Sequence, residues 1–519
     1  MAEVRVSARA GDPRETEADT RVVPVFEGES LDDPALQPLL DSGEAKGGFR
    51  KLAVAHEDAG GRSRRVVLVG AGKREELDHE RARVLAAASA GRAKELGARS
   101  LSWAAPPGDG VAGAIVEGTL LSLYSFDRFK SRRDGDDAPR VEALEVASTE
   151  GVDERGVEAG RVRAEAQNAA RDLQNTPANV ATPSFLAERA REIADAHGSL
   201  SIEVWGRDEI ESAGMGAFAS VAQGTYEEPR LIVMRYDGGG SGPLLGYVGK
   251  AVTFDTGGIS IKPSGKMHEM KFDMSGGAAV IEAMGAIARL AVPARILAVV
   301  PSTENMPSGR SVKPGDIVTA LNGKTIEVNN TDAEGRLLLA DALAYAVREG
   351  AEQLVDLATL TGAIIVALGS THAGLFSNDD EWYGQVEAAG SATGEIGWRL
   401  PLHPEYLELT KGQYADLTNA AEERKAMSIY AAEFLRQFVD DRPWVHMDIA
   451  GTAWGLGRPY VGKGASGFGV RTLVELAERA GGGASRGGSA HAGDGSTHTG
   501  DGSAHTGGGG SAPAAGGGG

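Results

Sequence analysis

The sequence predicts a mixed α/β protein in which a small N-terminal α/β domain precedes a larger C-terminal α/β domain with a mostly parallel central sheet. Three observations support this prediction. The chain has 519 residues, more than one ordinary hydrophobic core accommodates. Strand-like and helix-like runs alternate from about residue 174 to residue 480. A separate strand-and-helix pattern occupies the first 150 residues.

Residues 1–150 are expected to form the N-terminal domain. Residues 65–72 form a β-branched run that ends in glycines, and residues 79–96 are rich in alanine with apolar residues at helical spacing. Residues 101–103 and 141–146 are further strand candidates. A dinucleotide-binding turn at Gly70-Ala71-Gly72 is an alternative, but the third glycine and the acidic partner of that motif are missing. We therefore interpret these glycines as a tight turn between a strand and a helix.

A long helix over residues 151–173 is expected to connect the two domains, because this segment has the charge and alanine content of a helix. The C-terminal domain then spans residues 174–480. Its strand candidates are residues 231–234, 244–248, 296–300, 354–357 and 445–449. Its helix candidates include residues 278–290 and 337–347. Residues 481–519 are nearly all small or polar, so they cannot bury enough apolar surface and are expected to be a disordered tail.

Composition excludes several classes of function. The chain has no cysteine, which excludes disulfides, thiolate zinc sites and cysteine nucleophiles. A net charge of −20 disfavours binding to nucleic acid or to anionic lipid. The N-terminus lacks the apolar run of a secretory signal, and the apolar segment 354–369 is short and contains Asp356. We therefore expect a cytoplasmic protein without a membrane or nucleic-acid partner.

Two short glycine-bordered segments concentrate charged side chains. Residues 248–262 read V-G-K-A-V-T-F-D-T-G-G-I-S-I-K, and residues 329–337 read N-N-T-D-A-E-G-R-L. Together with a nearby aspartate they provide five candidate metal ligands, which are Lys250, Asp255, Asp273, Asp332 and Glu334. Lys262 and Arg336 remain as additional cations. This inventory is typical of a hydrolase with two metal ions.

The predicted positions of these residues support one common site. Lys250 and Asp255 follow the strand candidate 244–248, and ligand sites of open α/β sheets lie at the carboxyl ends of strands. Asp332 and Glu334 are two residues apart, so their side chains share one face if the segment is extended. Gly335 would then let the backbone turn tightly into the following helix.

Carboxylate and amine ligands suit divalent ions such as Mn²⁺, Zn²⁺, Mg²⁺ or Co²⁺. A lysine binds a metal only when it is neutral, and two adjacent dications would lower its pKa. Two such ions would lower the pKa of a shared water to about 7 and polarise a carbonyl group. The pattern therefore predicts hydrolysis at neutral pH.

Each candidate also has a simpler interpretation when it is taken alone. Asp332 and Glu334 fit the first turn of an ordinary helix, where acids satisfy backbone donors. Asp255 fits a turn and Asp273 fits a helix cap, while isolated lysines are usually at the surface. Only the joint pattern favours a metal site.

The chain resembles the leucyl aminopeptidases, or cytosol aminopeptidases, a family of dinuclear metallo-exopeptidases. Residues 330–337, N-T-D-A-E-G-R-L, match the signature octapeptide of that family. Further matches lie at residues 248–250, 253–263, 270–274, 304–307, 313–316, 356–362 and 446–454. The resemblance is strong from about residue 165 to residue 478 and loose in the N-terminal domain.

The resemblance implies a role for each candidate. One metal ion would be held by Lys250, Asp255, Asp273 and Glu334, and the other by Asp255, Asp332 and Glu334. The free α-amine of a peptide substrate would bind beside Lys250, which accounts for removal of N-terminal residues only. Lys262 would stabilise the oxyanion, and Arg336 would hold a bicarbonate ion that transfers the proton.

The resemblance also implies a specificity pocket and an assembly. The pocket would be lined by Met270, Thr359, Gly362, Ala450 and Ala453, which favours Leu or another apolar side chain. The family forms homo-hexamers. One departure is the segment 422–430, where bulkier residues replace the family's turn of small residues, so the substrate entrance or a subunit contact could differ.

Two alternatives come from other classes. Some family members bind DNA as regulators, but the acidic composition and the complete ligand set disfavour this role for the present chain. A dinuclear phosphoesterase is the second alternative. Such sites commonly use histidines, whereas His268 is the only histidine between residues 248 and 337.

Overall fold

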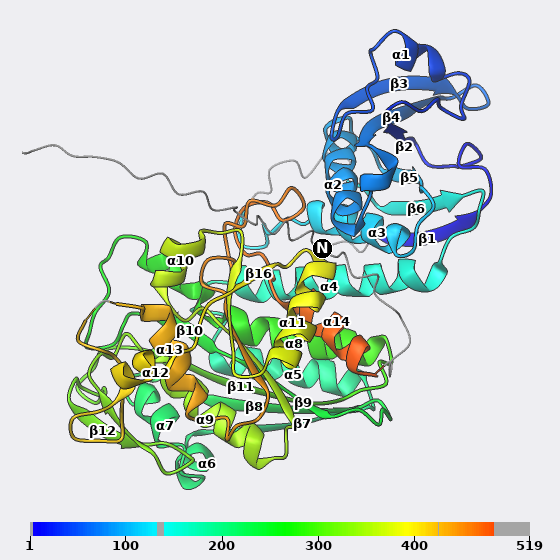
Figure 1. The fold of residues 1–519 in the computed structure, drawn as a ribbon. Helices are drawn as coiled ribbons and strands as arrows, with labels where there is room; N and C mark the ends of the chain where they lie inside the picture. The colour runs from blue at the N-terminus through cyan, green and yellow to red at the C-terminus, as the bar shows by residue number, and fades with distance from the viewer. Residues whose placement is uncertain (1–3, 132–139, 424, 482–519) are drawn as a thin grey trace, which may run out of the picture. The chain divides into compact units, whose positions relative to one another are not determined.

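The fold was obtained as a computed structural model that describes residues 4–131, 140–423 and 425–481 (Figure 1). The strands of these residues form three sheets, of six, nine and three strands. The mixed α/β class predicted from the sequence is confirmed. The tail predicted from residue 481 onward lies outside the described residues, except for residue 481 itself, which ends the last helix.

The six-stranded sheet has the order β1-β6-β5-β2-β4-β3, and its neighbouring strands are parallel except β3 and β4. Its strands are β1 (Arg5–Ala10), β2 (Thr20–Phe26), β3 (Leu52–Asp58), β4 (Ser63–Gly72), β5 (Ser100–Ala104) and β6 (Ala143–Ser148). Its helices are α1 (Gln37–Asp41), the 3-10 helix η1 (Arg74–Glu76), α2 (His79–Glu95) and α3 (Val111–Ser122). The strands and the long helix predicted for this region are therefore confirmed.

The predicted tight turn at residues 70–72 is wrong, because β4 continues through Gly72 and α2 begins only at His79. The close approach of a neighbouring loop explains why residue 70 is a glycine. A Cβ atom at Gly70 would lie 2.1 Å from the carbonyl oxygen of Gly48, so no side chain fits there.

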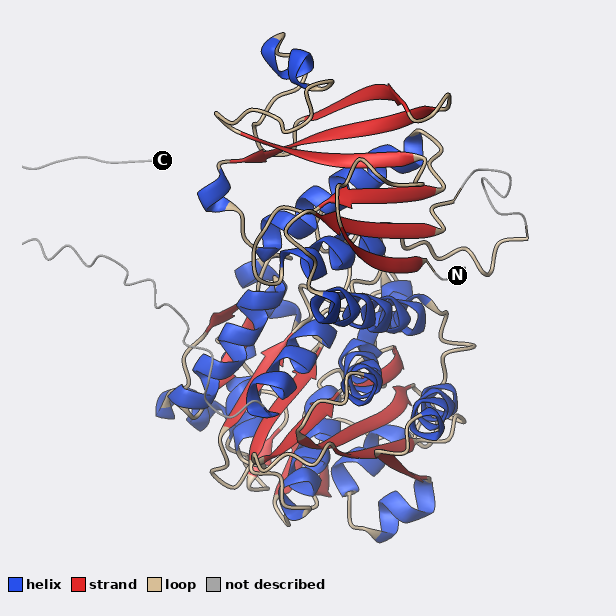
Figure 2. Ribbon diagram, turned by 90° about the vertical axis from the view of Figure 1, so that its right-hand side faces the viewer, coloured by secondary structure: helices blue, strands red, loops and turns tan. Residues whose placement is uncertain are grey.

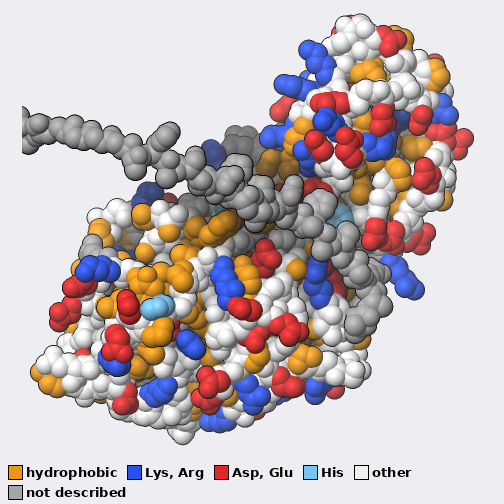
Figure 3. All heavy atoms as spheres, viewed as in Figure 1, with side chains coloured by type: hydrophobic (Ala, Val, Ile, Leu, Met, Phe, Trp, Pro, Cys, Tyr) orange, Lys and Arg blue, Asp and Glu red, His pale blue; other side chains and the backbone are white. Residues whose placement is uncertain are grey.

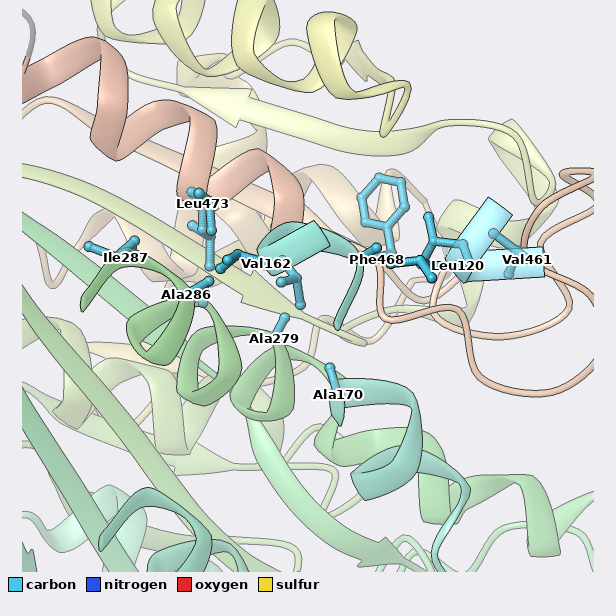
Figure 4. Close-up of a cluster of buried hydrophobic side chains, with 14 of the residues drawn as sticks. Leu120, Val162, Ala170, Ala279, Ala286, Ile287, Val461, Phe468 and Leu473 are labelled. Atoms are coloured by element: carbon cyan, nitrogen blue, oxygen red, sulfur yellow. The ribbon is translucent and has the colours of Figure 1, made fainter. Parts of the chain in front are cut away.

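Helix α4 (Glu154–Asn175) confirms the long helix predicted over this region. It packs against α3 on one side and against α8 (Ser275–Arg289) on another. Figure 4 shows this seam, in which Leu120 of α3, Val162 and Ala170 of α4, and Ala279 of α8 are buried together. The described residues all belong to one compact unit, so the predicted boundary near residue 150 stays a prediction.

The nine-stranded sheet has the order β16-β15-β18-β14-β9-β11-β8-β7, and β10 also pairs with β11. Its strands are β7 (Leu200–Trp205), β8 (Arg230–Asp237), β9 (Leu244–Gly249), β10 (Ala251–Asp255), β11 (Arg295–Asn305), β14 (Gln353–Ala358), β15 (Ala373–Ser377), β16 (Gly397–Arg399) and β18 (Trp444–Asp448). The central strands are parallel, and antiparallel pairs occur at β7 with β8, β8 with β11, and β15 with β18. The mostly parallel sheet predicted for this part of the chain is confirmed.

Helices cover both faces of this sheet (Figure 2). The helices of this part of the chain are α5 (Pro183–Ala196), α6 (Arg207–Ser212), α7 (Gly216–Ala222), η2 (Met267–Met274), α8, α9 (Gly335–Arg348), α10 (Gly362–Leu368), α11 (Asp380–Thr393), α12 (Pro404–Leu407), η3 (Glu408–Thr410), α13 (Met427–Arg436) and α14 (Val470–Gly481). Alternate residues of β8 belong to two hydrophobic cores, with Ile232 and Met234 in the core of α8 and Leu231 and Val233 in the core of α9. This alternation is expected when both faces of a strand are buried.

A three-stranded sheet, β12 (Asp316–Thr319), β13 (Thr325–Val328) and β17 (Leu417–Thr418), lies beside the chain that enters α9. Among the described residues, no helix is both long and apolar enough to cross a membrane. The apolar segment near residue 354 forms β14 and then α10 instead. Acidic and basic side chains are interspersed over the face shown in Figure 3.

Candidate metal centre

The candidate ligands lie at the carboxyl ends of the central strands. Lys250 follows β9 directly, and Asp255 is the last residue of β10. Asp273 belongs to η2, and Glu334 immediately precedes α9. Because β9, β11 and β14 are parallel, their carboxyl ends meet at one edge of the sheet. Residues that are far apart in the sequence thus come together where the strand pattern predicts.

Three buried carboxylates form the centre of the site. Asp255, Asp273 and Glu334 each offer an oxygen, and the three oxygens lie within 4.8 Å of one another. The Nζ atom of Lys250 lies 2.8 Å from Asp273 Oδ2 and 2.8 Å from Glu334 Oε1. Lys250 also donates a hydrogen bond of 2.9 Å to the carbonyl oxygen of Thr359. The lysine is therefore surrounded by oxygen atoms.

Asp332 lies at the outer side of this centre. Its side chain is 33% exposed, whereas those of Asp255 and Glu334 are 3% exposed. Lys262 connects Asp332 to the centre, because its Nζ lies 2.5 Å from Asp332 Oδ1 and 2.8 Å from Asp255 Oδ2. The two lysines thus lie on different sides of Asp255 and Glu334, one toward Asp273 and one toward Asp332.

The segment that carries Asp332 and Glu334 is not extended, so this part of the prediction is wrong. Thr331 and Asp332 form a turn, closed by a bond of 3.2 Å from the N–H of Ala333 to the carbonyl of Asn330, and Glu334 already has helical backbone angles. The turn still directs both acids to the site. Apart from that bond and one of 2.9 Å from the N–H of Asp332 to Oδ1 of Asn330, its hydrogen bonds involve side chains distant in the sequence, such as Ser260 and Asn305, which a local pattern does not reveal.

Gly335 also serves a different purpose from the predicted one. It is the first residue of α9. A Cβ atom there would lie 2.6 Å from Cε and 2.7 Å from Nζ of Lys250. Glycine is therefore required because the lysine side chain passes against the helix backbone, and not because the chain needs a special turn.

Burial and charge shift the pKa values of the site in opposite directions. Burial, followed by repulsion from Glu334, raises the pKa of Asp255 to about 6. Burial also raises the pKa values of Asp273 and Asp332. Burial would raise the pKa of Glu334 as well, but Lys250 and Lys262 outweigh it and lower that pKa. Burial lowers the lysine pKa values, but the surrounding carboxylates outweigh it and raise both.

These carboxylates are too numerous for their two lysine partners. Four acids face two ammonium groups, and the Oε2 atom of Glu334 is buried without a hydrogen-bond partner among the described residues. A buried carboxylate oxygen without a partner is costly, and a divalent cation would satisfy it. The donor set consists of oxygens and one amine, which fits Mn²⁺, Zn²⁺, Mg²⁺ or Co²⁺. Lys250 would have to lose its proton to join the ligands.

The simpler interpretation of the acids as helix caps does not hold. Glu334 occupies the N-cap position of α9, yet its side chain makes no capping hydrogen bond. The N-cap of α8 is Met274, and Asp273 points toward Lys250 and Thr359 instead. Asp255 does accept a turn bond of 2.8 Å from the N–H of Gly257, through the oxygen that does not contact Lys262.

Arg336 lies two residues after Glu334 and is buried, and within the described part of the chain it forms no ion pair with the candidate ligands. Its Nη1 donates a hydrogen bond of 2.5 Å to the carbonyl oxygen of Asn419, and its guanidinium lies 5.2 Å from the ring centre of Tyr430. Its Nε is buried and has no hydrogen-bond partner among the described residues. A guanidinium with an unused donor is suited to a small planar anion.

The residues predicted to line the specificity pocket have different environments. Thr359 donates a hydrogen bond of 2.6 Å to Asp273 Oδ1, so it touches a candidate ligand directly. Met270 lies in η2 with Asp273, and Gly362 begins α10. Ala450 is 7% exposed and Ala453 is fully buried. Their role in specificity stays a prediction.

A cavity of about 550 Å³ adjoins the site on the side of the three-stranded sheet. Ser260 and Asn330 form its inner wall, and both contact the turn that carries Asp332. Ile317 and Tyr414 contribute exposed apolar surface to the wall, and Glu422 from the unusual segment 422–430 also lines the cavity. The effect of this segment on the substrate entrance or on a subunit contact stays a prediction.

Sequence reasoning assigned no role to two asparagines that hold the site together. Asn305 Nδ2 donates to Asp255 Oδ1 at 2.8 Å and to the carbonyl of Thr331 at 3.0 Å. Asn419 bonds to the segment before Glu334 and to Arg336. Asn305 is the last residue of the central strand β11, and this position could have indicated that it lies near the site. Asn419 follows a two-residue strand without any motif, so nothing in the sequence indicated it.

Comparison with known proteins identifies similar sequences over most of the chain. Residues 168–474 match the catalytic domain of the cytosol aminopeptidase family, and residues 22–133 match the N-terminal domain of the same family. A probable cytosol aminopeptidase of Solibacter usitatus is 47% identical over 89% of this chain and 96% of that protein. Another from Roseiflexus castenholzii is 45% identical over 91% of this chain and 98% of that protein.

Solved structures show the same similarity. The bottromycin maturation enzyme BotP in complex with Mn has a TM-score of 0.80 and 35% sequence identity to this chain. The match covers 89% of this chain and 99% of the chain of BotP.

Proposed function

The chain belongs to the cytosol aminopeptidase family, and we propose that it is a two-metal aminopeptidase that releases N-terminal residues, preferentially Leu or other apolar residues, from peptides. The observation that carries the proposal is the group of three buried carboxylates within 4.8 Å of one another, bordered by Lys250. A metal-dependent hydrolase needs such a group, whereas a purely structural core would avoid this uncompensated charge.

The arrangement supports two metal positions that share ligands. Lys250, Asp255, Asp273 and Glu334 would hold one ion, and Asp255, Asp332 and Glu334 would hold the other. The lysine contacts support this division. Lys250 contacts Asp273 and Glu334 of the first ligand set, and Lys262 contacts Asp255 and Asp332 of the second. Bound divalent ions would supply hydroxide at neutral pH and polarise the peptide carbonyl. Mn²⁺ and Zn²⁺ are the ions we propose first, with Mg²⁺ and Co²⁺ as alternatives.

Lys262 would act on the substrate. Its side chain is 21% exposed, in contrast to the 3% of Lys250, so it is accessible to a bound peptide. The surrounding carboxylates raise its pKa, which keeps the ammonium charged at neutral pH. We propose that it donates a hydrogen bond to the oxyanion that forms when the peptide carbonyl is attacked.

Arg336 would hold an anion that transfers a proton from the attacking water to the leaving amine. Of the described residues, no histidine contacts the carboxylates. The unused Nε of Arg336 supports an anion such as bicarbonate at this position, and that anion would accept the proton of the attacking water and pass it to the leaving amine.

The substrate would enter as a peptide with a free N-terminus. Its first side chain would lie near Met270, Thr359, Gly362, Ala450 and Ala453, and the chain after the cleaved bond would extend into the cavity of about 550 Å³. The homo-hexamer expected from the family resemblance is a further prediction, which size-exclusion chromatography with light scattering tests directly.

Hydrolysis of leucine p-nitroanilide tests the proposal. We expect cleavage with Mn²⁺ or Zn²⁺, loss of cleavage after chelation, and recovery when the metal is restored. The matched substrate is N-acetyl-leucine p-nitroanilide, which lacks the free amine and should resist cleavage. Equal rates for both substrates would contradict the aminopeptidase assignment, and full activity after exhaustive chelation would contradict the role of the metals.

A further inference from the structure

Residues 329–333 connect β13 to α9 and carry the turn that presents Asp332. Glu334 and Arg336 follow immediately, so three residues of the proposed site depend on the path of this segment. The segment leaves the three-stranded sheet after Val328 and pairs with no strand of the described residues. Its backbone groups must therefore find their hydrogen-bond partners elsewhere.

The side chain of Asn419 provides four of these partners. Its Oδ1 accepts hydrogen bonds from the N–H groups of Asn329 at 2.8 Å and Asn330 at 3.2 Å. Its Nδ2 donates to the carbonyl oxygens of Asn330 at 2.7 Å and Ala333 at 3.3 Å. These four bonds use the whole capacity of an amide side chain, and Asn419 is fully buried.

The backbone of Asn419 ties the same residue to two other elements. Its N–H donates to the carbonyl of Glu327 at 2.9 Å, directly after the last residue of β17 that pairs with β13. Its carbonyl accepts the bond of 2.5 Å from Nη1 of Arg336. One residue thus contacts the end of β13, the irregular segment and the first turn of α9.

We propose that Asn419 is a positioning residue for the metal centre, which fixes the path of residues 329–333 and thereby places Asp332, Glu334 and Arg336. An amide is required, because aspartate lacks the two donors, glutamine is longer by one methylene group and serine cannot reach all four backbone groups. The assignment of these acids to metal binding rests on the proposed function. The positioning itself follows from the hydrogen bonds.

The test compares Asn419→Ala with Asn378→Ala. Asn378 is the control, because its side chain also bonds to the backbone, although to two groups and not four: the N–H of Trp444 and the carbonyl of Arg442, both at 2.9 Å. It lies beyond the carboxyl end of β15, which is antiparallel to β18, so it is at the opposite edge of the sheet from the site. Both variants lose hydrogen bonds from a side chain to the backbone and should melt at a lower temperature than the wild type.

Of the two variants, only Asn419→Ala should weaken Mn²⁺ binding. Titration of metal-free protein with Mn²⁺, followed by the electron paramagnetic resonance of free Mn²⁺, should show a half-saturation concentration raised tenfold or more for Asn419→Ala and within twofold of wild type for Asn378→Ala. Hydrogen exchange of the Asn329 and Asn330 amides should accelerate in Asn419→Ala alone. Unchanged Mn²⁺ binding despite faster exchange would overturn the inference.

The outcomes separate this inference from the proposed function. Wild-type protein that binds Mn²⁺ but cleaves no leucine p-nitroanilide contradicts the function, while a weakened titration for Asn419→Ala still supports positioning. If Asn419→Ala does not fold, Asn419→Asp keeps the two accepted bonds and loses the two donated ones. We then expect at least a threefold shift in half-saturation, and an unchanged value would again overturn the inference.

Discussion

Replacement of Glu117 with Gln should destabilise the folded protein by about 3 kcal/mol at pH 7. Glu117 lies in α3 and is 3% exposed. Its Oε2 accepts hydrogen bonds from Arg83 Nε at 2.7 Å and from Arg471 Nη1 at 3.2 Å, and Arg163 Nη1 lies 3.8 Å from Oε1. Three arginines from α2, α4 and α14 therefore share one buried carboxylate.

The magnitude follows from the shifted pKa of this carboxylate. Burial would raise the pKa of Glu117, but Arg83, Arg471 and Arg163 outweigh burial and lower it from 4.5 to about 2. One unit of pKa corresponds to about 1.4 kcal/mol. The lowering of this pKa therefore contributes about 3 kcal/mol to the free energy of unfolding at neutral pH. Because the folded state holds the carboxylate ionised, this stability is present above pH 4.5 and is lost as the pH falls toward 2.

Urea denaturation of wild type and Glu117→Gln at several pH values measures this contribution. The difference in unfolding free energy should be about 3 kcal/mol at pH 7 and about 1.5 kcal/mol at pH 3. Glu188→Gln is the control, because Glu188 pairs with Arg191 on the exposed face of α5, and it should change stability by less than about 0.5 kcal/mol. A pH-independent difference, or equal stability of Glu117→Gln and wild type at pH 7, would refute the reasoning.

Two predictions concern the proposed metal centre. Lys262→Ala should lower kcat by about 10²- to 10³-fold, as loss of an oxyanion donor does, while elemental analysis finds a normal metal content; loss of metal would make Lys262 a ligand instead. Gly335→Ala should weaken both Mn²⁺ binding and turnover tenfold or more, because the new Cβ would lie 2.6 Å from Cε of Lys250. Gly384→Ala in α11, where a Cβ has no neighbour within 4 Å, is the control, and equal Mn²⁺ affinity of the two alanine variants would contradict the predicted displacement of Lys250.

Local patterns predicted most elements of the fold correctly. The helices α2, α8 and α9 and the strands β8, β9, β11, β14 and β18 lie where apolar periodicity and β-branched runs indicated them, and α4 lies where charge and alanine content indicated a helix. Such patterns reflect which faces of an element are buried, and they are contained in a short stretch of sequence. The turn predicted at residues 70–72 failed because the close approach of Gly48 kept glycines inside a strand.

The chemical inventory of the site is readable from the amino-acid sequence: five candidate ligands, two further cations, no thiolate, and motifs typical of one family. The arrangement of these groups became visible only in the folded chain. It placed Lys250 against Gly335, it put Lys262 between Asp255 and Asp332, and it supplied Asn419. The physical reason is that an irregular segment satisfies its backbone with side chains from distant strands, and neither spacing nor periodicity encodes those contacts.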